Sequence, residues 1–254
     1  MVREARPAVL ITGGARRIGA VLARTFDAAG WHVVVHVRHS DAASAAFVES
    51  LPHAELVECD LSDGDAAAAM VSDLAARLGD WRALVNCAAV FEYDDAAALL
   101  PEVWAEAITV NAAAPVRLAQ AFLEQAQAAG GKRVINFLDQ KLANPNPDFF
   151  SYTMAKQALA AATRMLAMGA GDTQTRVYGL APGAMLPSFD QQTHEHEASG
   201  RMNLLGRLTD PLELAEAALW LCEGWLASGE TLFIDSGQHL LAQSRDVLFL
   251  ARGE

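Results

Sequence analysis

Short β-branched runs alternate with long alanine-rich stretches along this chain, and this alternation constrains its fold more than any other feature. Each run is about as long as one buried strand, and the runs occupy residues 9–11, 33–35, 56–57, 83–85, 134–135, 177–178 and 232–234. Strands that are apolar on both faces and alternate with helices form parallel sheets with helices on both sides. We therefore predict a doubly wound α/β domain, with about seven parallel strands flanked by helices.

The composition excludes several classes of protein. A chain of 254 residues, 52% of them hydrophobic, can bury the core of a single domain over residues 1–254. The formal net charge of -12, from 19 Lys+Arg and 31 Asp+Glu, argues against a nucleic-acid partner, because phosphate binding needs a cationic surface. We therefore expect a small-molecule substrate.

Cysteine use and hydropathy indicate a compartment. Cys59, Cys87 and Cys222 are widely spaced and form no CxxC pair, so they predict neither a disulfide framework nor a zinc site. No stretch of about 18 residues is continuously apolar, and the apolar run before Gly13 is too short for a secretory signal. These features predict a cytoplasmic protein without a membrane span.

A glycine-containing turn follows the first predicted strand and opens a helix. Residues 12–19 read Thr-Gly-Gly-Ala-Arg-Arg-Ile-Gly, and Ile18, Leu22 and Phe26 recur at helical spacing. In such a turn glycines let the backbone approach a pyrophosphate, and the helix N-terminus stabilises its charge. The alternative is a structural turn that binds nothing. We predict a Rossmann-type dinucleotide site that includes Gly13, Arg16, Arg17, Ile18 and Gly19.

The end of the second predicted strand indicates which dinucleotide binds. NAD-preferring folds place a carboxylate there for the ribose hydroxyls, whereas this chain has no acid from His36 to Ser40. The Arg38 guanidinium can form paired hydrogen bonds to a 2′-phosphate, and His39 and Ser40 can add donors. The neighbouring Asp41 weakens this preference. We predict NADPH as the cofactor, bound by His36, Arg38, His39 and Ser40, with its 2′-phosphate at Arg38, His39 and Ser40.

The residues after the third predicted strand extend the same site. Asp60 has the position and chemistry to accept from the amino group of an adenine ring, and Leu61 can contact the ring. An equally valid interpretation makes Asp60 the cap of the following helix.

Tyr152 and Lys156 form a catalytic pattern, with Asp139 thirteen residues before the tyrosine. If the stretch from Tyr152 is helical, tyrosine and lysine lie one turn apart on the same face. An ammonium beside a phenol favours the phenolate, so we expect it to lower the pKa of Tyr152 from about 10. The tyrosine could then exchange protons near neutrality, which predicts proton transfer coupled to hydride transfer.

Taken in order, the glycine turn, Asn86, Asn111 and the Tyr152-x-x-x-Lys156 pair resemble the short-chain dehydrogenase/reductase family over almost the whole chain. The resemblance implies a doubly wound fold, a nicotinamide cofactor and, commonly, a tetramer. It implies that Tyr152 donates the proton, that Lys156 binds the nicotinamide ribose and that Asn111 supports a water-linked proton relay. Further residues that it places beside the cofactor are Asn86, Ala88, Pro182 and Gly183.

Four departures from the general family pattern resemble the pteridine reductase branch, which includes dihydromonapterin and dihydrofolate reductases of the short-chain type. They are Arg17 in place of a glycine, the His/Arg/Ser cluster at 36–40, an aromatic residue at Phe91, and Asp139 in place of a serine. The resemblance implies that a pterin stacks between Phe91 and the nicotinamide while Arg17 contacts phosphate and substrate. The alternative makes Phe91 an ordinary core aromatic.

Asp139 distinguishes two classes of substrate. A serine at this position would donate to a carbonyl oxygen, whereas an ionised carboxylate would repel it. A dihydropterin instead needs hydride at a ring carbon and a proton at a ring nitrogen, and its amino groups can donate to a carboxylate. Asp139 and Tyr152 are therefore predicted to orient the ring and supply the proton. In the alternative, Asp139 only caps local amides at a strand end.

Residues 184–201 are predicted to form a long substrate loop, whose apolar residues Met185, Leu186 and Phe189 could cover a bound ring. His194 and His196 stand two residues apart and could converge on one ion if the loop is extended. No second ligand cluster is identifiable in the sequence, so we predict no metal site.

Together these residues predict an NADPH-dependent reductase of a reduced pterin, of the dihydromonapterin, dihydrobiopterin or dihydrofolate type. One alternative is a short-chain carbonyl reductase of a ketone or 3-oxoacyl substrate, for which Asp139 is unsuited. Another is a non-catalytic NADPH-binding regulator, against which the intact Tyr152, Lys156 and Asn111 argue.

Overall fold

The computed structural model describes residues 6–188, 191–224 and 226–253. Within these residues seven parallel strands form one sheet in the order β3-β2-β1-β4-β5-β6-β7. The strands are β1 (Ala8–Ile11), β2 (His32–Val37), β3 (Ala54–Glu58), β4 (Trp81–Asn86), β5 (Arg133–Phe137), β6 (Arg176–Pro182) and β7 (Thr231–Ile234). This architecture confirms the predicted doubly wound α/β fold.

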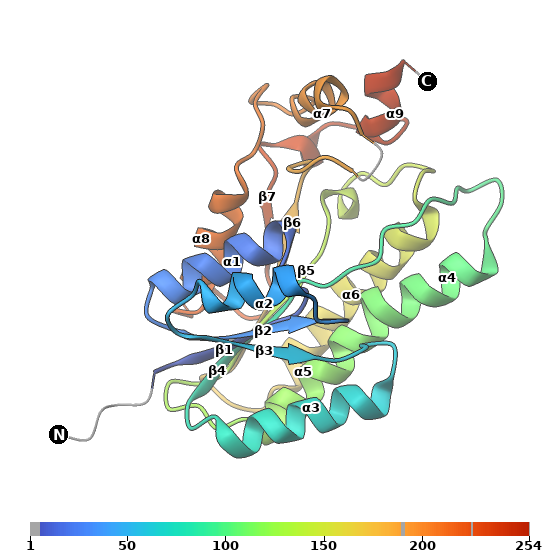
Figure 1. Ribbon diagram of the computed structural model, residues 1–254. Helices are drawn as coiled ribbons and strands as arrows, with labels where there is room; N and C mark the ends of the chain where they lie inside the picture. Colours follow the sequence, from blue (N-terminus) through green and yellow to red (C-terminus); the bar gives the residue numbers. More distant parts are fainter. Residues whose placement is uncertain (1–5, 189–190, 225, 254) are drawn as a thin grey trace.

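Helices cover both faces of the sheet (Figure 1). One face carries α1 (Arg17–Ala28), α2 (Ala42–Glu49) and α8 (Pro211–Leu221). The other carries α3 (Gly64–Arg77), α4 (Pro101–Ile108), α5 (Ala114–Gln125) and α6 (Phe150–Gly169). The short helices α7 (Thr193–Gly200) and α9 (Val247–Arg252) lie together beyond the sheet, at the top of Figure 1. Because the seven strands are parallel, the loops that follow them lie along the same edge of the sheet.

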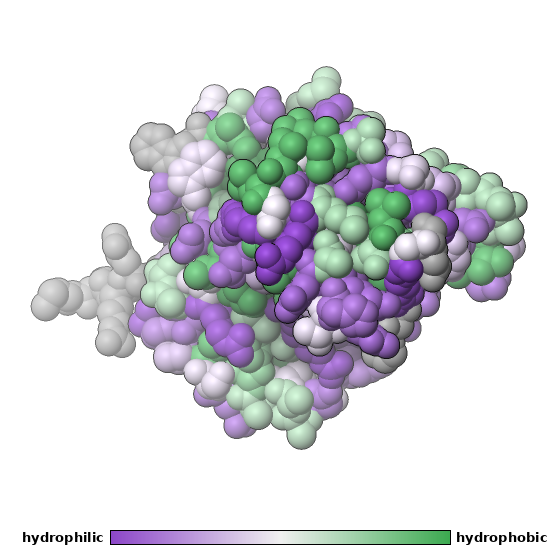
Figure 2. Space-filling model, turned by 90° about the horizontal axis from the view of Figure 1, so that it is seen from above, coloured by the Kyte–Doolittle hydropathy of each residue, from purple (hydrophilic) through white to green (hydrophobic). Residues whose placement is uncertain are grey.

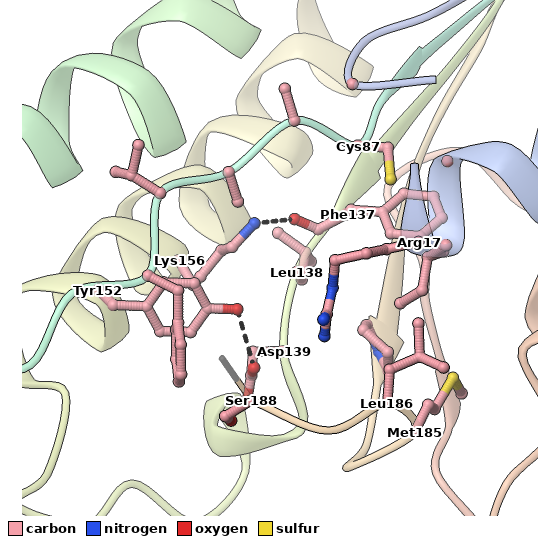
Figure 3. Close-up of a pocket in the computed structure, with 18 of the residues that line it drawn as sticks. Arg17, Cys87, Phe137, Leu138, Asp139, Tyr152, Lys156, Met185, Leu186 and Ser188 are labelled. Carbon is pink, nitrogen blue, oxygen red and sulfur yellow. Dashed lines mark hydrogen bonds between the residues drawn. The ribbon is translucent and has the colours of Figure 1, made fainter. Parts of the chain in front are cut away.

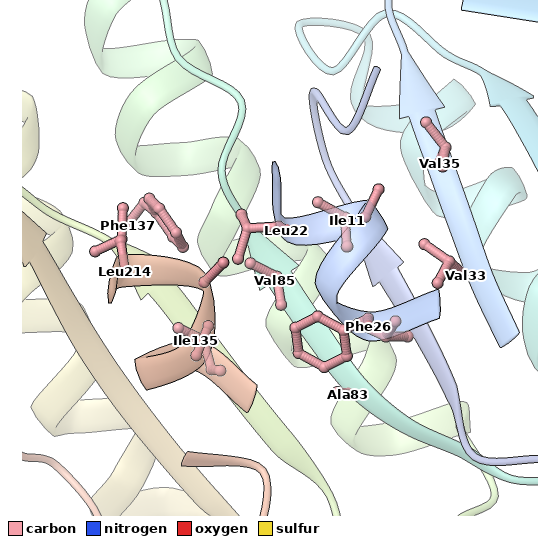
Figure 4. Packing of buried hydrophobic residues seen from close by; sticks show 14 of the residues in the cluster. Ile11, Leu22, Phe26, Val33, Val35, Ala83, Val85, Ile135, Phe137 and Leu214 are labelled. Carbon is pink, nitrogen blue, oxygen red and sulfur yellow. The ribbon is translucent and has the colours of Figure 1, made fainter. Parts of the chain in front are cut away.

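The core explains why the strands are apolar on both faces. On one side Leu22 and Phe26 of α1 and Leu214 of α8 pack against Ile135 and its neighbours in the sheet (Figure 4). On the opposite side a second apolar layer joins α3 and α5 to the same strands. Because each fully buried leucine or phenylalanine contributes about 1.5–3 kcal/mol, these two layers hold the helices firmly on the sheet.

The carboxyl ends of β1 and β4 form the point where the strand order reverses. β1 pairs with β2 on one side and β4 on the other, so the loops after β1 and β4 diverge and leave a crevice. The Thr12 hydroxyl oxygen spans the two loops by accepting from the backbone N–H groups of Cys87 (2.9 Å) and Ala88 (3.0 Å). Figure 2 views the molecule from above relative to Figure 1, with hydrophobic side chains lying among hydrophilic ones.

The predicted loop over residues 184–201 is partly helical, which corrects the sequence interpretation. Gln192 and Glu195 form reciprocal capping bonds that start α7 at Thr193. His194 and His196 therefore lie on a helix, where side chains two residues apart point to different sides. Among the residues with described positions, no group of three or more His, Cys, Asp and Glu could hold a metal ion. Phe189 lies outside the described residues.

Within the described ranges, no helix is both long enough and apolar enough to span a membrane.

Candidate active site

A cavity of about 650 Å³ opens at the carboxyl ends of the strands, within the size range of small-molecule sites. Its wall is formed by the glycine turn, the loops after β4, β5 and β6, the start of α6 and the segment before α9. The predicted site residues in this wall are Gly13, Arg16, Arg17, Ile18, Gly19, His36, Arg38, Asp60, Leu61, Ala88, Phe91, Asp139, Tyr152, Lys156, Pro182 and Gly183. Predicted residues that the wall does not include are His39, Ser40, Asn86 and Asn111.

The glycines of the turn are required by its geometry. Gly13 has a φ of +65°, and a Cβ on Gly19 would lie 2.1 Å from the Gly13 carbonyl oxygen. Arg17, where the family pattern has a glycine, also adopts a left-handed φ of 50°. Within the described residues no side chain caps α1, whose N-cap is Arg16. The first amides of α1 are therefore available to an anionic group, which fits a pyrophosphate.

His36 has a role in the fold in addition to the predicted one. Its side chain is buried, its Nδ1 accepts from the Gly13 N–H (3.2 Å), and its Nε2 lies 2.8 Å from the Cys59 carbonyl oxygen. Burial lowers the pKa of His36, so the ring is neutral and donates through Nε2. Both ring nitrogens are thus used within the protein. His36 supports the glycine turn from β2 and also lines the cavity, so its predicted part in cofactor binding stays a prediction.

The predicted phosphate ligands contact carboxylates. Arg38 donates to Asp60 (3.0 Å), while the Ser40 N–H donates to Glu58 (2.9 Å) and the His39 ring lies 3.9 Å from the same carboxylate. These bonds lower the pKa of Glu58, with the Ser40 hydroxyl as the largest cause. Glu58 is the last residue of β3, and no sequence motif predicted its part in this cluster. The Glu58 carboxylate therefore already contacts two of the predicted phosphate donors, Ser40 and His39.

The alternative that made Asp60 a helix cap is wrong. Asp63 caps α3, because its carboxylate accepts from the N–H groups of Asp65 and Ala66 (3.0 Å each). Asp60 instead accepts from Ser62 and Arg38 and lies in the cavity wall.

Tyr152 and Lys156 project from the first turns of α6 toward the end of β5 (Figure 3). The Tyr152 hydroxyl donates to Oδ2 of Asp139 (3.0 Å), and Oδ1 of Asp139 accepts from the Lys141 N–H (2.8 Å). The Lys156 ammonium donates to the Phe137 carbonyl (2.6 Å) and lies 5.6 Å from the Tyr152 ring centroid. An acid, a cation and a carboxylate therefore meet at one side of the cavity.

The ionisation of these groups departs from the sequence prediction. Burial raises the pKa of Tyr152 well above its ordinary value, and the neighbouring Asp139 raises it further. Burial also lowers the pKa of Lys156 to about 8 and raises that of Asp139. The pKa of Tyr152 therefore lies above its ordinary value and not below it as predicted, because desolvation and the carboxylate have the larger effect.

Phe91 lies at the mouth of the cavity, so the alternative that made it a core aromatic is wrong. Its side chain is 42% exposed. It stacks on Phe149 with ring centroids 4.1 Å apart and meets the Tyr152 ring edge-on at 4.7 Å. Phe149 has a left-handed φ of 51° immediately before α6, a strained conformation that is often found at functional sites. The stack places a flat apolar surface beside the catalytic tyrosine.

The two predicted asparagines make structural hydrogen bonds and are not among the residues that line the cavity. Asn86 is buried and donates to Asn136 (2.8 Å) across β4 and β5. Asn111 lies in a short π-helical turn, and its amide exchanges two 2.9 Å hydrogen bonds with the backbone of Val90. The side chain of Asn111 thereby fixes the loop that carries Phe91. Its predicted part in a proton relay stays a prediction.

Arg17 and the loop after β6 close the opposite side of the cavity. The Arg17 guanidinium reaches into the space between Tyr152 and the loop with Met185 and Leu186 (Figure 3), and it donates to the Pro187 carbonyl (2.9 Å). A Cβ on Gly183 would lie 2.7 Å from the Gln238 side chain, so the turn after Pro182 also needs glycine. The Arg17 guanidinium therefore faces the side of the cavity that carries Tyr152 and Asp139.

Sequence reasoning missed several residues of the wall. Lys141, Gln238 and the segment Asp246 to Leu248 line the cavity. The last of these follows Asp139 by more than a hundred residues. No spacing rule connects such distant positions, so the sequence carried no local signal for them.

A doubly wound sheet with a glycine turn at its switch point and a Tyr–Lys pair beside it defines a class of dinucleotide-dependent oxidoreductases. A family model described as Enoyl-(Acyl carrier protein) reductase matches residues 13–239. The chain therefore belongs to the short-chain dehydrogenase/reductase family.

Known relatives of the chain differ in substrate. FolM alternative dihydrofolate reductase 1 from Brucella canis, complexed with NADP, superimposes with a TM-score of 0.88 at 32% identity, covering 95% of this chain and 97% of that one. The Brucella suis protein of the same name, also with NADP, gives a TM-score of 0.87 at 32% identity, with coverage of 97% and 99%. The 3beta-hydroxysteroid dehydrogenase 1 of Eggerthella lenta is 28% identical over 255 residues, which cover 91% of this chain and 93% of the relative.

Proposed function

We propose that this oxidoreductase reduces a dihydropterin, of the dihydromonapterin, dihydrobiopterin or dihydrofolate type, with NADPH. The observation that carries the proposal is the Asp139 carboxylate bonded to the Tyr152 hydroxyl in the cavity wall. A carboxylate there accepts from ring amino groups and repels a developing alkoxide, so it suits a C=N bond better than a C=O bond. The likeness to two FolM dihydrofolate reductases supports the same substrate class.

The residues present fit the proposed cofactor. The tight contact between Gly13 and Gly19 and the open start of α1 suit a pyrophosphate, and Arg38 can reach a 2′-phosphate. When bound, NADPH supplies the hydride. The NADP complexes of the two structural neighbours support the choice of the phosphorylated cofactor.

The side chains have separate tasks in the proposed reaction. Asp139 holds the amino groups of the ring, and Tyr152 gives its hydroxyl proton to the ring nitrogen. Lys156, four residues on along α6, provides a positive charge beside the phenolate that remains. Phe91 supports the flat ring, because stacked aromatic pairs contribute about 0.5–1.5 kcal/mol beyond burial.

A single-turnover experiment tests the function. Enzyme, NADPH and a dihydropterin are mixed, and loss of the reduced-nicotinamide absorbance is followed over time. We expect one equivalent to be consumed, and Tyr152→Phe to bind NADPH with unchanged affinity but to lose turnover roughly 100-fold or more. Absence of turnover with every dihydropterin tested would contradict the proposal.

The same assay separates the alternatives. Faster turnover of ketones or 3-oxoacyl substrates would identify a carbonyl reductase. NADPH binding with no turnover of either class would identify a regulator. We also infer a cytoplasmic location and a tetrameric assembly, both of which rest on the sequence and on the family resemblance.

A further inference from the structure

A buried lysine, Lys141, lies next to Asp139, but its ammonium pairs with a different carboxylate. Lys141 is 3% exposed, and its backbone N–H, not its ammonium, donates to Asp139. The ammonium pairs with Oδ2 of Asp246 (2.5 Å), donates to the Asp148 carbonyl (3.2 Å) and lies 5.0 Å from the Phe149 ring centroid. Asp246 therefore determines where this cation points.

The segment that carries Asp246 is fixed at both ends. The buried carboxylate of Asp148 accepts from the Arg245 side chain (2.8 Å) and from the Asp246 N–H (2.7 Å). Beyond Asp246, the ring of Phe249 stacks on Phe149 with centroids 6.2 Å apart. The segment thus reaches the cavity wall in one defined position, and Asp246 lies in that wall.

This arrangement matters for Asp139. Its two oxygens accept from the Lys141 N–H and from the Tyr152 hydroxyl. A buried ammonium without a partner is strongly unfavourable and would turn to the nearest carboxylate. The Lys141 charge acts on two other carboxylates, those of Asp139 and Asp148. Asp148 already accepts from Arg245 and from the Asp246 N–H. Without the Asp246 charge the ammonium would therefore turn toward Asp139, and the tyrosine would have to compete with it for the Asp139 oxygens.

We propose that Asp246 is a positioning residue of the active site, which holds the Lys141 ammonium so that Asp139 stays available to Tyr152 and to the substrate. The statement that Asp139 stays available to the substrate rests on the proposed dihydropterin reduction. The statement that it stays available to Tyr152 does not depend on that function. Asp246 touches neither reacting group and acts through Lys141.

The charged groups around Asp139 set the direction of the expected pH effect. Lys141 lowers the pKa of Asp139, and Asp246 raises it. Tyr152 and Lys156 face Asp139 from α6, and the Asp148–Arg245 pair lies behind Asp246. Asp139 must be ionised to accept from the ring, so activity is present above its pKa and is lost as the pH falls through it.

Asp246→Asn tests the proposal, because asparagine keeps the N-cap of α9 and removes only the charge. We expect kcat to fall at least tenfold with NADPH affinity unchanged, and the acid limb of the pH profile to move down by roughly one unit. Lys141→Gln should move that limb upward, and the double variant should recover most of the lost kcat. Asp210→Asn, which alters the N-cap of α8 away from the cavity, is the matched control and should change none of these.

Carbon-13 NMR of the aspartate carboxyls provides a readout that needs no substrate. The resonance of Asp139, assigned with Asp139→Asn, should titrate at lower pH in Asp246→Asn and at higher pH in Lys141→Gln. If Asp246→Asn does not fold, the Asp139 titration in Lys141→Gln tests the proposal by itself. The proposal would be overturned if Asp139 titrates at the same pH in the variants as in the wild type. It would also be overturned if the kcat of the double variant is as low as that of Asp246→Asn. Failure of the dihydropterin assay in the wild type would contradict the function but leave this titration decisive.

Discussion

Burial lowers the pKa of Lys156 to about 8, which places its loss of charge within the working range of most enzymes. Below this pKa the ammonium is present, and above it the neutral amine cannot stabilise a phenolate at Tyr152. We therefore expect kcat/KM to fall as the pH rises through about 8. Tyr152 itself does not contribute to this limb, because its pKa lies well above its ordinary value.

The measurement is a pH–rate profile of the wild type and of Lys156→Arg. Arginine stays charged over the whole range, so the alkaline fall should disappear or move upward in the variant. A fall at the same pH in both proteins would assign it to another group.

Asp139 provides a second prediction for a single residue. Asp139→Asn preserves size but replaces one acceptor oxygen with a donor, so it weakens the hold on ring amino groups and on Tyr152. We expect kcat/KM for the dihydropterin to drop roughly 100-fold while the NADPH dissociation constant is unchanged. Full activity in this variant would remove the argument that separates pterins from ketones.

The glycine turn and α1 act as one element. A Cβ on Gly19 would lie 2.1 Å from the Gly13 carbonyl oxygen, so Gly19→Ala must push α1 away from the turn. Overpacking of this kind costs about 1–3 kcal/mol, and the displaced amides should weaken NADPH binding at least tenfold. Gly79→Ala is the control, since a Cβ there meets nothing within 4 Å. Thermal unfolding and fluorescence titration of NADPH measure the two effects.

The end of β3 also affects cofactor choice. Glu58 contacts the predicted phosphate donors Ser40 and His39, and its charge opposes a 2′-phosphate placed beside them. Glu58→Gln should therefore tighten NADPH binding roughly fivefold and leave NADH nearly unchanged, with the effect reduced in high salt because the site is exposed. Glu49→Gln, at the exposed end of α2, should affect neither cofactor.

At the scale of the whole molecule, exposed apolar side chains favour assembly. Met165 and Met168 lie on one face of α6 and are 70% and 86% exposed. We expect the purified protein to sediment with four times the mass of the chain, as the family resemblance implies. The double variant Met165→Glu/Met168→Glu should lower that mass, whereas a wild type that sediments as a monomer would contradict the prediction.

The whole molecule also explains which sequence interpretations failed. The support that His36 gives to the glycine turn was missed, because its place in a polar cluster predicted only a cofactor contact, whereas β2 directs it inward between Gly13 and Cys59. The tyrosine pKa was predicted from one neighbouring charge, whereas desolvation by the surrounding elements has the larger effect. Both errors come from reasoning about neighbours in sequence when the decisive neighbours lie on other elements.

The parallel sheet, the glycine turn and the one-turn spacing of Tyr152 and Lys156 could be predicted from the sequence, because they depend on local periodicity and on residues a few positions apart. The ionisation of the catalytic groups and the residues that complete their cavity depend on contacts made in the folded chain. The pairing of Lys141 with Asp246 joins residues more than a hundred positions apart. Such contacts exist only after the sheet has brought its loops to one end, so no local pattern could predict them.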